Sequence, residues 1–274
     1  MILIVDSGST KTHWCLAENG VIQKELKTKG MNPFFQCPAE LSFEVCKMKL
    51  SMKQFPIERI FFYGAGCAFG KQQLVIDAFK ENTDIPLEVY SDLLGAARSL
   101  CGRSAGIASI LGTGSNSCFY DDEQIVQNVS PLGFILGDEG SGSALGKRFF
   151  GDLLKDLLPI EIVEAFTQTY DLRVDDILNA VYKEPFPNRF LAKFSPFIIR
   201  HIHVPEIEAL VKANFADFFQ RCIMQYDYAN YPVHFIGSIA SYYEEQLRSS
   251  AEALGITVGT VEQSPMKGLI RYHS

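Results

Sequence analysis

Two segments of the chain repeat one pattern, and this repeat limits the possible folds more than any other feature of the sequence. Each segment is an apolar strand, a turn of Gly, Ser and Thr, and a second strand: MILIVDSGSTKTHW (1–14) and ASILGTGSNSCFY (108–120). In both, another turn and a third short strand follow. Because internal repeats reflect repeated structural units, the pattern predicts two similar halves whose glycine turns face each other across a cleft.

Both turns have the composition of a phosphate-binding loop. Glycine lets the backbone approach a ligand closely, and successive amides, hydroxyls and one ammonium group can surround an anion. For the first segment alone, a β-turn rich in Ser and Gly, with Asp6 as an ordinary turn residue, is an open alternative. The candidate phosphate-binding residues are Gly8, Ser9, Thr10, Lys11 and Thr12 in the first turn and Gly112, Thr113, Gly114 and Ser115 in the second.

The order of the apolar segments predicts a mixed α/β fold. Residues 1–104 follow the order β-β-β-α-β-α-β-α, and the same order returns from residue 105 with additional helices. We therefore expect an N-terminal domain at 1–104 and a C-terminal domain at 105–263, with a helical insertion at about 150–230. Within these helical regions, the periodicity predicts single helices over 190–203 and 239–254.

Composition and charge exclude several classes of protein. The chain has 274 residues, 47% of them apolar, which is enough for two domains with full cores. The net charge of −7, without a dense Lys/Arg cluster, argues against nucleic acid or an anionic membrane as a partner. The sequence has no apolar run long enough to predict a membrane span, and the segment MILIVD at its start lacks the basic region of a signal peptide. Seven cysteines without a CxxC or CxxH pair predict reduced thiols, no zinc site and a cytoplasmic location.

Three aspartates stand at strand ends or beside glycine turns, where ligands bind in open α/β sheets. Asp6, beside the first turn, could hold Mg²⁺, in part through water. Asp92 ends a strand and precedes a helix, so it could be either a general base in the cleft or a helix N-cap. Asp138, with Glu139, could be a site residue or an acidic group favoured by a helix dipole.

The segment Gly237-Ser238-Ile239-Ala240 follows a predicted strand and opens a predicted helix. A glycine at such a junction would let a nucleotide base or ribose lie against the backbone. A strand-to-helix turn capped by Ser238 is the alternative interpretation.

Several of these segments together resemble the actin-like ATPase superfamily of sugar kinases, actin and Hsp70. Within it, the sequence looks like the BadF/BadG/BcrA/BcrD ATPase group and its N-acetylglucosamine kinase branch. The resemblance covers residues 1–145 and 233–270, and it implies two ribonuclease H-like domains around a nucleotide cleft, with the closing helix at 264–274 on the first domain. The segments that carry it are the two turns, SDLLGAARS (91–99), GTGSNS (112–117), GDEGS (137–141) and FIGSIA (235–240).

The resemblance also implies a role for each matching residue. Asp6 would lie near the metal, Asp92 would be the catalytic base, and Gly237, Ser238 and Ala240 would contact adenosine. Where mammalian-type members have Trp-Gly before GDEGS, this chain has Leu132-Gly133, which puts the shape of the sugar pocket in doubt. The implied sugar contacts are Asn32, Gly64, Ala65, Gly66, Asp92, Thr113, Asn116, Gly133 and Asp138.

The activity implied is ATP-dependent phosphorylation of an aminosugar, with N-acetylglucosamine converted to its 6-phosphate by a homodimer that uses ATP and Mg²⁺. Mg-ATP would lie between the two glycine turns. One alternative is an ATPase activator of a 2-hydroxyacyl-CoA dehydratase, which would need cysteines around an iron–sulfur cluster. Another is a sugar-binding regulator without turnover. The acceptor stays open among N-acetylglucosamine, glucosamine and N-acetylmuramic acid.

Overall fold

The computed structural model describes residues 1–8, 10–67 and 70–274. The chain divides into two compact units. Unit 1 comprises residues 1–104, 121–125 and 264–274, and unit 2 comprises 105–120 and 126–263. Both contain one five-stranded sheet with helices, so the predicted α/β class is confirmed.

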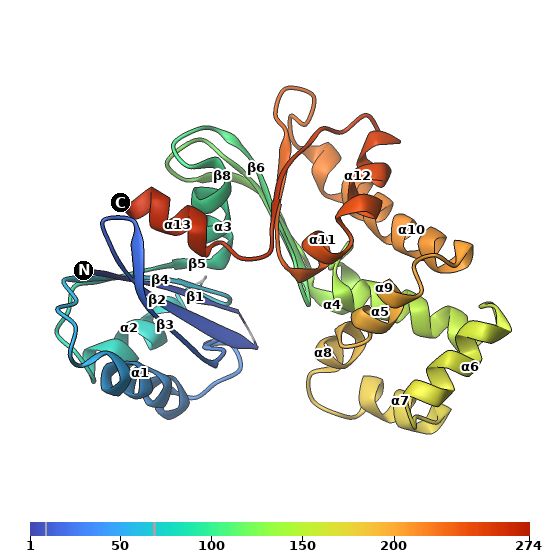
Figure 1. The fold of residues 1–274 in the computed structure, drawn as a ribbon, viewed down its shortest axis with the longest axis horizontal. Helices are drawn as coiled ribbons and strands as arrows, with labels where there is room; N and C mark the ends of the chain where they lie inside the picture. Colours follow the sequence, from blue (N-terminus) through green and yellow to red (C-terminus); the bar gives the residue numbers. More distant parts are fainter. Residues whose placement is uncertain (9, 68–69) are drawn as a thin grey trace. The chain divides into compact units, whose positions relative to one another are not determined.

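The sheet of unit 1 has the strand order β3-β2-β1-β4-β5 (Figure 1). The hairpin neighbours β1–β2 and β2–β3 are antiparallel, whereas β1–β4 and β4–β5 are parallel and connected through helices. The carboxyl ends of β1, β4 and β5 therefore meet at one edge, which collects the turns that follow them. The strands are β1 (Ile2–Ser7), β2 (Lys11–Glu18), β3 (Val21–Lys29), β4 (Arg59–Gly64) and β5 (Leu87–Ser91).

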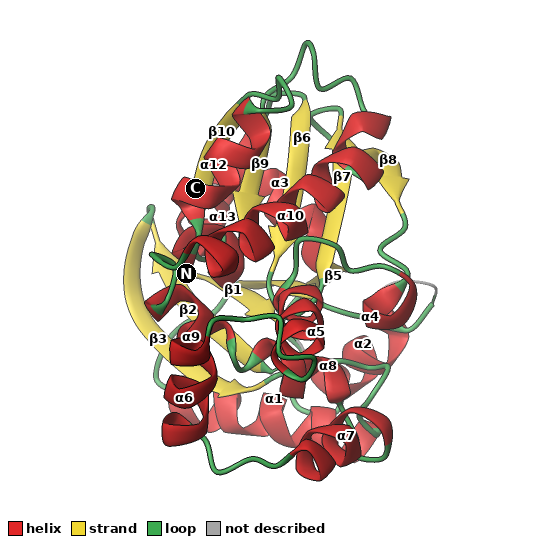
Figure 2. Ribbon diagram, turned by 90° about the vertical axis from the view of Figure 1, so that its right-hand side faces the viewer, coloured by secondary structure: helices red, strands yellow, loops and turns green. Residues whose placement is uncertain are grey.

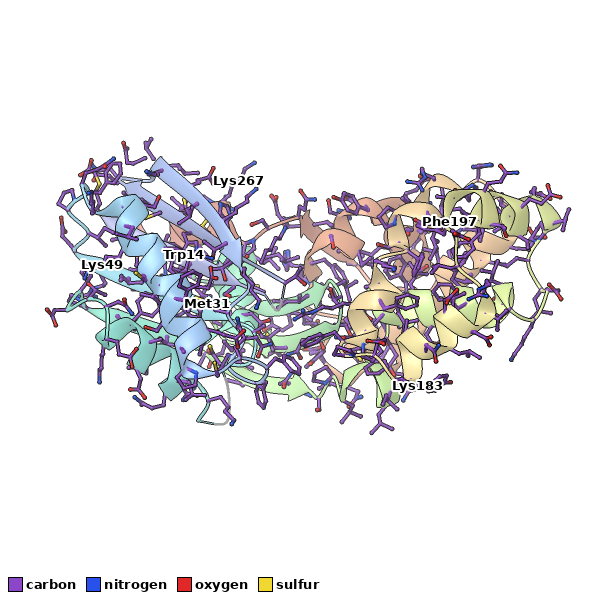
Figure 3. The ribbon with its side chains drawn as sticks, turned by 90° about the horizontal axis from the view of Figure 1, so that it is seen from below. Trp14, Met31, Lys49, Lys183, Phe197 and Lys267 are labelled. Atoms are coloured by element: carbon purple, nitrogen blue, oxygen red, sulfur yellow. The ribbon has the colours of Figure 1, made fainter. Side chains whose placement is uncertain are left out.

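Side chains that alternate along the strands of unit 1 fill two layers of core. Leu3 and Val5 of β1 belong to the layer under α1 (Pro38–Met52) and α2 (Gln72–Lys80). That layer also holds Trp14 and Met31, which Figure 3 labels. Ile4 points to the opposite layer, which includes Leu269 of α13 (Met266–His273). There α13 lies beside α3 (Asp92–Cys101), so the last helix of the chain completes the core of unit 1.

The sheet of unit 2 has the order β10-β9-β6-β7-β8, which repeats the pattern of unit 1 (Figure 2). The hairpin β6–β7 is antiparallel, and β9 lies parallel to both β6 and β10. The predicted repeat is thus confirmed at the level of strand topology. The strands are β6 (Gly106–Leu111), β7 (Ser115–Tyr120), β8 (Ile125–Val129), β9 (Val233–Ile236) and β10 (Val258–Glu262).

The helices of unit 2 share one apolar core with the sheet, in which phenylalanine is prominent. Phe197, labelled in Figure 3, is fully buried among Phe149, Phe166 and His201. The helices are α4 (Gly133–Leu136), α5 (Gly142–Leu153), α6 (Ile160–Thr169), α7 (Val174–Tyr182), α8 (Pro187–Ala192), α9 (Ser195–Arg200), α10 (Pro205–Arg221), a 3₁₀ turn (Ile223–Gln225), α11 (Ser238–Tyr242) and α12 (Glu244–Glu252).

Two helices predicted as continuous are each broken. The predicted helix at 190–203 divides into α8 and α9, because Pro196 has no amide hydrogen to donate and is accepted only in the first turn of a helix. The predicted helix at 239–254 divides at Tyr243, whose buried hydroxyl donates to the Ser195 carbonyl (2.6 Å). His201 and His203, expected on a helix, lie in the turn after α9.

No helix in the described part of the chain is long and apolar enough to span a membrane.

Candidate functional site

The first glycine turn connects β1 and β2 of unit 1. Ser7 pairs with Thr12 across the hairpin, and the Gly8 amide donates to the Lys11 carbonyl (3.0 Å). Thr10 and Lys11 are exposed, so their side chains are available to a ligand. Thr12 is fully buried, and its hydroxyl donates to the Lys29 carbonyl (3.0 Å), so it supports the turn from within. Ser9, a predicted phosphate contact, lies outside the described residues.

The second glycine turn connects β6 and β7 of unit 2. The Gly112 amide donates to the Gly114 carbonyl (2.9 Å), and the amides of Gly142 and Ser143 donate to the carbonyls of Gly112 (2.8 Å) and Thr113 (3.0 Å). The start of α5 thus holds the turn from one side. The amides of Thr113 and Gly114 have no backbone acceptor within the described residues, so they could donate to an anion.

Gly8 and Gly112 occupy corresponding places in the two turns, and neither is required by the packing of its own unit. Within the part of the chain that the structure describes, a Cβ atom at Gly8 would meet no atom closer than the Lys11 carbonyl at 3.8 Å, and one at Gly112 would meet nothing within 4 Å. Neither has a positive φ. Because folding explains neither glycine, the open space beside each backbone fits a ligand such as a polyphosphate.

The Asp138 side chain packs against the second turn at Gly114 and Ser115. Its Oδ1 accepts a hydrogen bond from the Ser115 amide (3.2 Å), and a Cβ at Gly114 would lie 3.0 Å from its Oδ2. The side chain is buried, and φ is +57°. Burial raises the pKa of Asp138 to about 6, and the Ser115 amide opposes this rise. The N-cap of α5 is Ser141, so Asp138 is not the helix cap.

The candidate metal and base residues of unit 1 lie close enough to interact. Burial raises the pKa of the Asp6 carboxyl to about 7, and repulsion from Asp92 adds to the rise, while Lys11 opposes it. Burial likewise raises the pKa of Asp92 to about 6. The N-cap of α3 is Ser91, whose hydroxyl accepts from the Leu94 amide (3.2 Å), so the capping alternative for Asp92 is not needed.

This pair of carboxylates fits a divalent cation. The Asp6 carboxylate accepts no hydrogen bond from a described residue, and repulsion from Asp92 opposes its ionisation, so positive charge nearby would favour the ionised form. Within the described residues no group of three or more His, Cys, Asp or Glu side chains could hold a metal. One or two carboxylates, with the remaining positions filled by water and phosphate oxygens, is the arrangement that Mg²⁺ takes in phosphate-binding enzymes.

The candidate sugar residues of unit 1 lie at the same edge of the sheet. Asn32 is buried, and its Oδ1 accepts from the Phe34 amide (3.0 Å). Gly66, with φ +79°, lies so close to this side chain that a Cβ there would be 2.3 Å from Oδ1. Cys67 follows, and the carboxylate of Asp92 contributes to its raised pKa, after burial. Gly64 pairs with Ser91 between β4 and β5, so Asp92 follows directly beside the 64–66 turn that contacts Asn32.

The sugar-contact candidates Asn116 and Gly133 belong to unit 2. Asn116 is half-buried on β7, where its Oδ1 accepts from the Asn128 side chain (2.9 Å) and the Ser117 amide (3.0 Å). Gly133, with φ +75°, opens α4. This short helix connects β8 to the turn that carries Asp138.

Gly237 forms the junction between β9 and α11. Its φ of +125° is available to glycine alone, and a Cβ would lie 2.2 Å from the Leu111 carbonyl, at the start of the second turn. Ser238 begins α11, whereas Ala240 is fully buried beneath it. Packing by itself accounts for this glycine, and the close approach of β9 and β6 brings the junction next to the second turn.

Ser7 lies in the first repeated segment but is not among the predicted contact residues. It is fully buried at the end of β1, and it contacts both the loop of Asn32 and the 64–66 turn. Its position between a strand-end aspartate and a glycine was the available signal.

Two sheets of β-β-β-α-β-α-β type, with glycine turns at the first hairpin of each, define the actin-like ATPase and sugar kinase fold. Comparison with solved structures agrees. The chain is 49% identical to a protein from Porphyromonas gingivalis described as a putative N-acetylglucosamine kinase, with a TM-score of 0.95 over 100% of this chain and 98% of that one. The chain therefore belongs to the same family as the Porphyromonas protein, within the sugar kinase superfamily.

More distant structures share the fold. A putative N-acetylglucosamine kinase from Chromobacterium violaceum is 16% identical, with a TM-score of 0.69 over 100% of this chain and 99% of that one. A ROK family glucokinase from Streptomyces griseus, solved with glucose and AMPPNP, is 15% identical, with a TM-score of 0.60 over 98% and 97%. No family model matches the chain, and the comparison with curated proteins found no match.

Proposed function

We propose that this protein is a sugar kinase that transfers the γ-phosphate of ATP to the 6-hydroxyl of an aminosugar, most specifically N-acetylglucosamine. The family relationship supports the reaction class, and the name of the Porphyromonas relative supports the acceptor. We assign the protein to the N-acetylglucosamine kinase branch of the BadF/BadG/BcrA/BcrD group, as a cytoplasmic homodimer.

The observation that carries the proposal is the pair of glycines in corresponding turns, Gly8 and Gly112, which neither strain nor packing explains. Phosphate oxygens bound at both turns would account for them. Adenosine would lie at Gly237 and Ser238, next to the second turn, with the buried Ala240 supporting the start of α11.

In this proposal Asp92 is the general base. Its raised pKa, about 6, leaves it ionised at neutral pH but basic enough to accept the proton of the attacking hydroxyl. Asp6 would hold Mg²⁺, which when bound neutralises charge that develops on the phosphates. The sugar would be oriented by Asn32, the 64–66 turn, Thr113, Asn116, Gly133 and Asp138. Phosphoryl transfer depends mostly on such positioning.

A coupled assay of ADP release tests the proposal. Purified protein with Mg-ATP is offered N-acetylglucosamine, glucosamine, N-acetylmuramic acid, N-acetylmannosamine and glucose. We expect ADP release that depends on sugar and is fastest with N-acetylglucosamine, with the 6-phosphate identified by NMR. ADP release at the same rate with and without every sugar would overturn the proposal and favour an ATPase.

A further inference from the structure

Ser7 occupies the place in unit 1 where three candidate ligand-binding segments meet. The first glycine turn follows it directly in the chain. Its carbonyl accepts from the Ala65 amide (2.7 Å), which fixes the 64–66 turn. Its hydroxyl contacts both backbone polar groups of Met31: it accepts a hydrogen bond from the amide (2.9 Å) and lies 3.1 Å from the carbonyl oxygen. Met31 immediately precedes Asn32.

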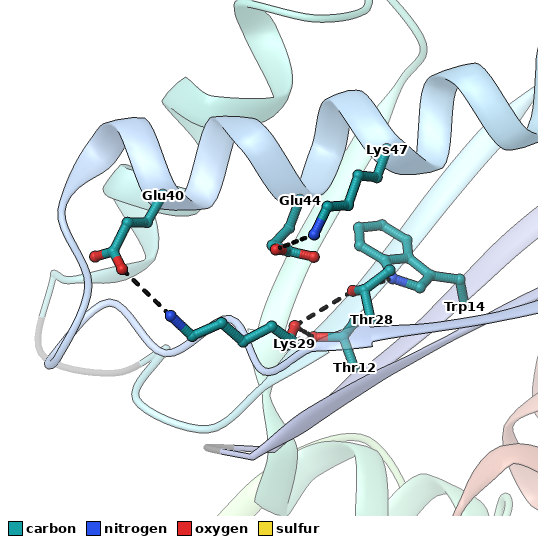
Figure 4. Close-up of polar contacts among 7 residues, drawn as sticks. All are labelled: Thr12, Trp14, Thr28, Lys29, Glu40, Glu44 and Lys47. Carbon is teal, nitrogen blue, oxygen red and sulfur yellow. Dashed lines mark hydrogen bonds and ion pairs between the residues drawn. The ribbon is translucent and has the colours of Figure 1, made fainter.

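Thr12, across the hairpin from Ser7, extends this contact. The two hydroxyl oxygens are 2.7 Å apart, and Thr12 also donates to the Lys29 carbonyl (3.0 Å). Figure 4 shows that the Lys29 carbonyl also accepts a hydrogen bond from the Thr28 hydroxyl. The Thr28 hydroxyl in turn accepts a hydrogen bond from the Trp14 ring nitrogen (2.9 Å). The Gly30 amide donates to the Thr10 carbonyl (3.0 Å). Residues 29–31 are thus hydrogen-bonded to the first turn and to the two residues, Ser7 and Thr12, that flank it.

The hydroxyls of Ser7 and Thr12 make more contacts than they have hydrogens to donate. Ser7 and Thr12 have one hydroxyl hydrogen each, and these two hydrogens serve three contacts: the Ser7–Thr12 contact, the Lys29 carbonyl and the Met31 carbonyl. Both side chains are fully buried, so water cannot supply a replacement. Only two of the three contacts can hold a hydrogen at one time, so the two hydroxyls form one linked network between the turn and the carbonyls of Lys29 and Met31.

We propose that Ser7, together with Thr12, is a positioning residue that couples the phosphate turn to the sugar-binding loop: occupancy of the turn sets the position of Asn32. The inference rests on the proposed function, because it takes the first turn as the nucleotide site and Asn32 as a sugar contact. Ser7 touches neither ligand and acts through Asn32 and the 64–66 turn.

Hydrogen–deuterium exchange tests the coupling without any sugar. In the wild-type chain, Mg·AMP-PNP is expected to slow exchange in residues 30–36. In Ser7→Ala, and in Thr12→Val, the nucleotide should still slow exchange in the first turn but leave residues 30–36 unprotected. Ser109→Ala is the matched control, because Ser109 is an equally buried strand serine whose hydroxyl has no partner in the described residues. Equal protection of residues 30–36 in Ser7→Ala and wild type would overturn the inference.

A double-mutant cycle gives the kinetic test. Loss of one buried hydrogen bond corresponds to about a fivefold rise in the sugar KM of Ser7→Ala, with the ATP KM changed less than about twofold. In an Asn32→Ala background, Ser7→Ala should raise the sugar KM no further, since its effect passes through Asn32. Fully additive effects would contradict the coupling. A wild-type chain that shows the nucleotide-dependent protection but phosphorylates no sugar would refute the proposed function and still support the coupling; a chain that binds no nucleotide would refute both.

Discussion

Gly66 and Asn32 are in direct contact, and the contact leaves no room for a side chain at Gly66. A Cβ there would lie 2.3 Å from Oδ1 of Asn32, and 2.9 Å from the Phe34 ring. The backbone amide of Asn32 donates to the Gln36 side chain (2.6 Å). The preceding residue, Met31, is held by the Ser7 hydroxyl. The position of this candidate sugar contact is therefore set from several sides.

Gly66→Ala should displace Asn32 and raise the sugar KM about tenfold or more, with a loss of about 1–3 kcal/mol in stability from the strained φ and the clash. Steady-state kinetics and chemical denaturation measure the two effects. Gly70→Ala is the control, because Gly70 has nearly the same φ, +81°, but a Cβ there meets no atom of the described residues within 4 Å. It should share the strain and keep the sugar KM; equal KM values in both variants would argue against Asn32 as a sugar contact.

Gly112→Ala should separate folding from nucleotide binding. Because a Cβ at Gly112 meets no atom of residues 1–8, 10–67 and 70–274 within 4 Å and its φ is not positive, the variant should melt within about 2 °C of wild type. If phosphate approaches this backbone, the added methyl should weaken ATP binding about tenfold or more, as measured by calorimetry. Gly151→Ala in α5, equally open, should leave ATP binding unchanged. Unaltered ATP affinity in Gly112→Ala would remove the second turn from the phosphate site.

Asp92→Asn should lower turnover about 10²- to 10⁴-fold, the usual contribution of a general base, while ATP still binds. The same change should stabilise the ligand-free protein at pH 8. The pKa of Asp92 is raised from 3.8 to about 6 in the folded state, so ionisation above that range costs stability, on the order of 1 kcal/mol after solvent screening. Thermal unfolding at pH 8 measures it. An equally active and no more stable variant would exclude Asp92 as the base, whereas Asp77→Asn on the surface of α2 should change neither property.

The pH profile of the reaction should carry the same signature. Since the base must be ionised in the free enzyme, kcat/KM should fall as the pH drops through the range of about 6 to 7 set by Asp92 and Asp6. ATP binding measured by calorimetry at each pH separates this titration from that of the nucleotide. A profile that stays flat down to pH 5 would contradict the proposed base.

The stability of unit 1 should depend on pH through His273 of α13. Its Nε2 accepts from the Tyr63 hydroxyl (2.7 Å), which itself accepts from Arg98 (3.1 Å), and burial together with the Arg98 cation lowers the pKa of His273 to about 4. Between that value and the ordinary 6.5 the unfolded chain binds more protons, so stability should decline as the pH falls from about 6.5 to about 4, by about 1–2 kcal/mol.

His273→Gln keeps an acceptor for Tyr63 but does not titrate, so it should flatten this part of the stability curve. Denaturation at pH 7 and pH 5 gives the comparison. The same pH dependence in both proteins would place the titrating group elsewhere.

Much of the fold could be predicted from local pattern. The strands, the two hairpins and α1, α2 and α3 follow from apolar periodicity, because a strand or a short helix is specified by which faces of it are buried. The breaks at Pro196 and Tyr243 were less accessible. The first break depends on the missing amide hydrogen of Pro196, which the apolar pattern hides. The second lies at Tyr243, whose hydroxyl contacts Ser195 in a distant part of the chain.

The sequence by itself determined the repeated strand–turn–strand plan and the acidic residues at strand ends, because both are written in contiguous stretches of chain. Only the tertiary structure decided which glycines are free of packing demands, that Ser91 rather than Asp92 caps α3, and that Ser7 joins the first turn to the loop of Asn32. The first relationship depends on empty space and the last links residues 24 positions apart, so neither leaves a local pattern in the sequence. The cap depends on which of two adjacent side chains reaches the Leu94 amide.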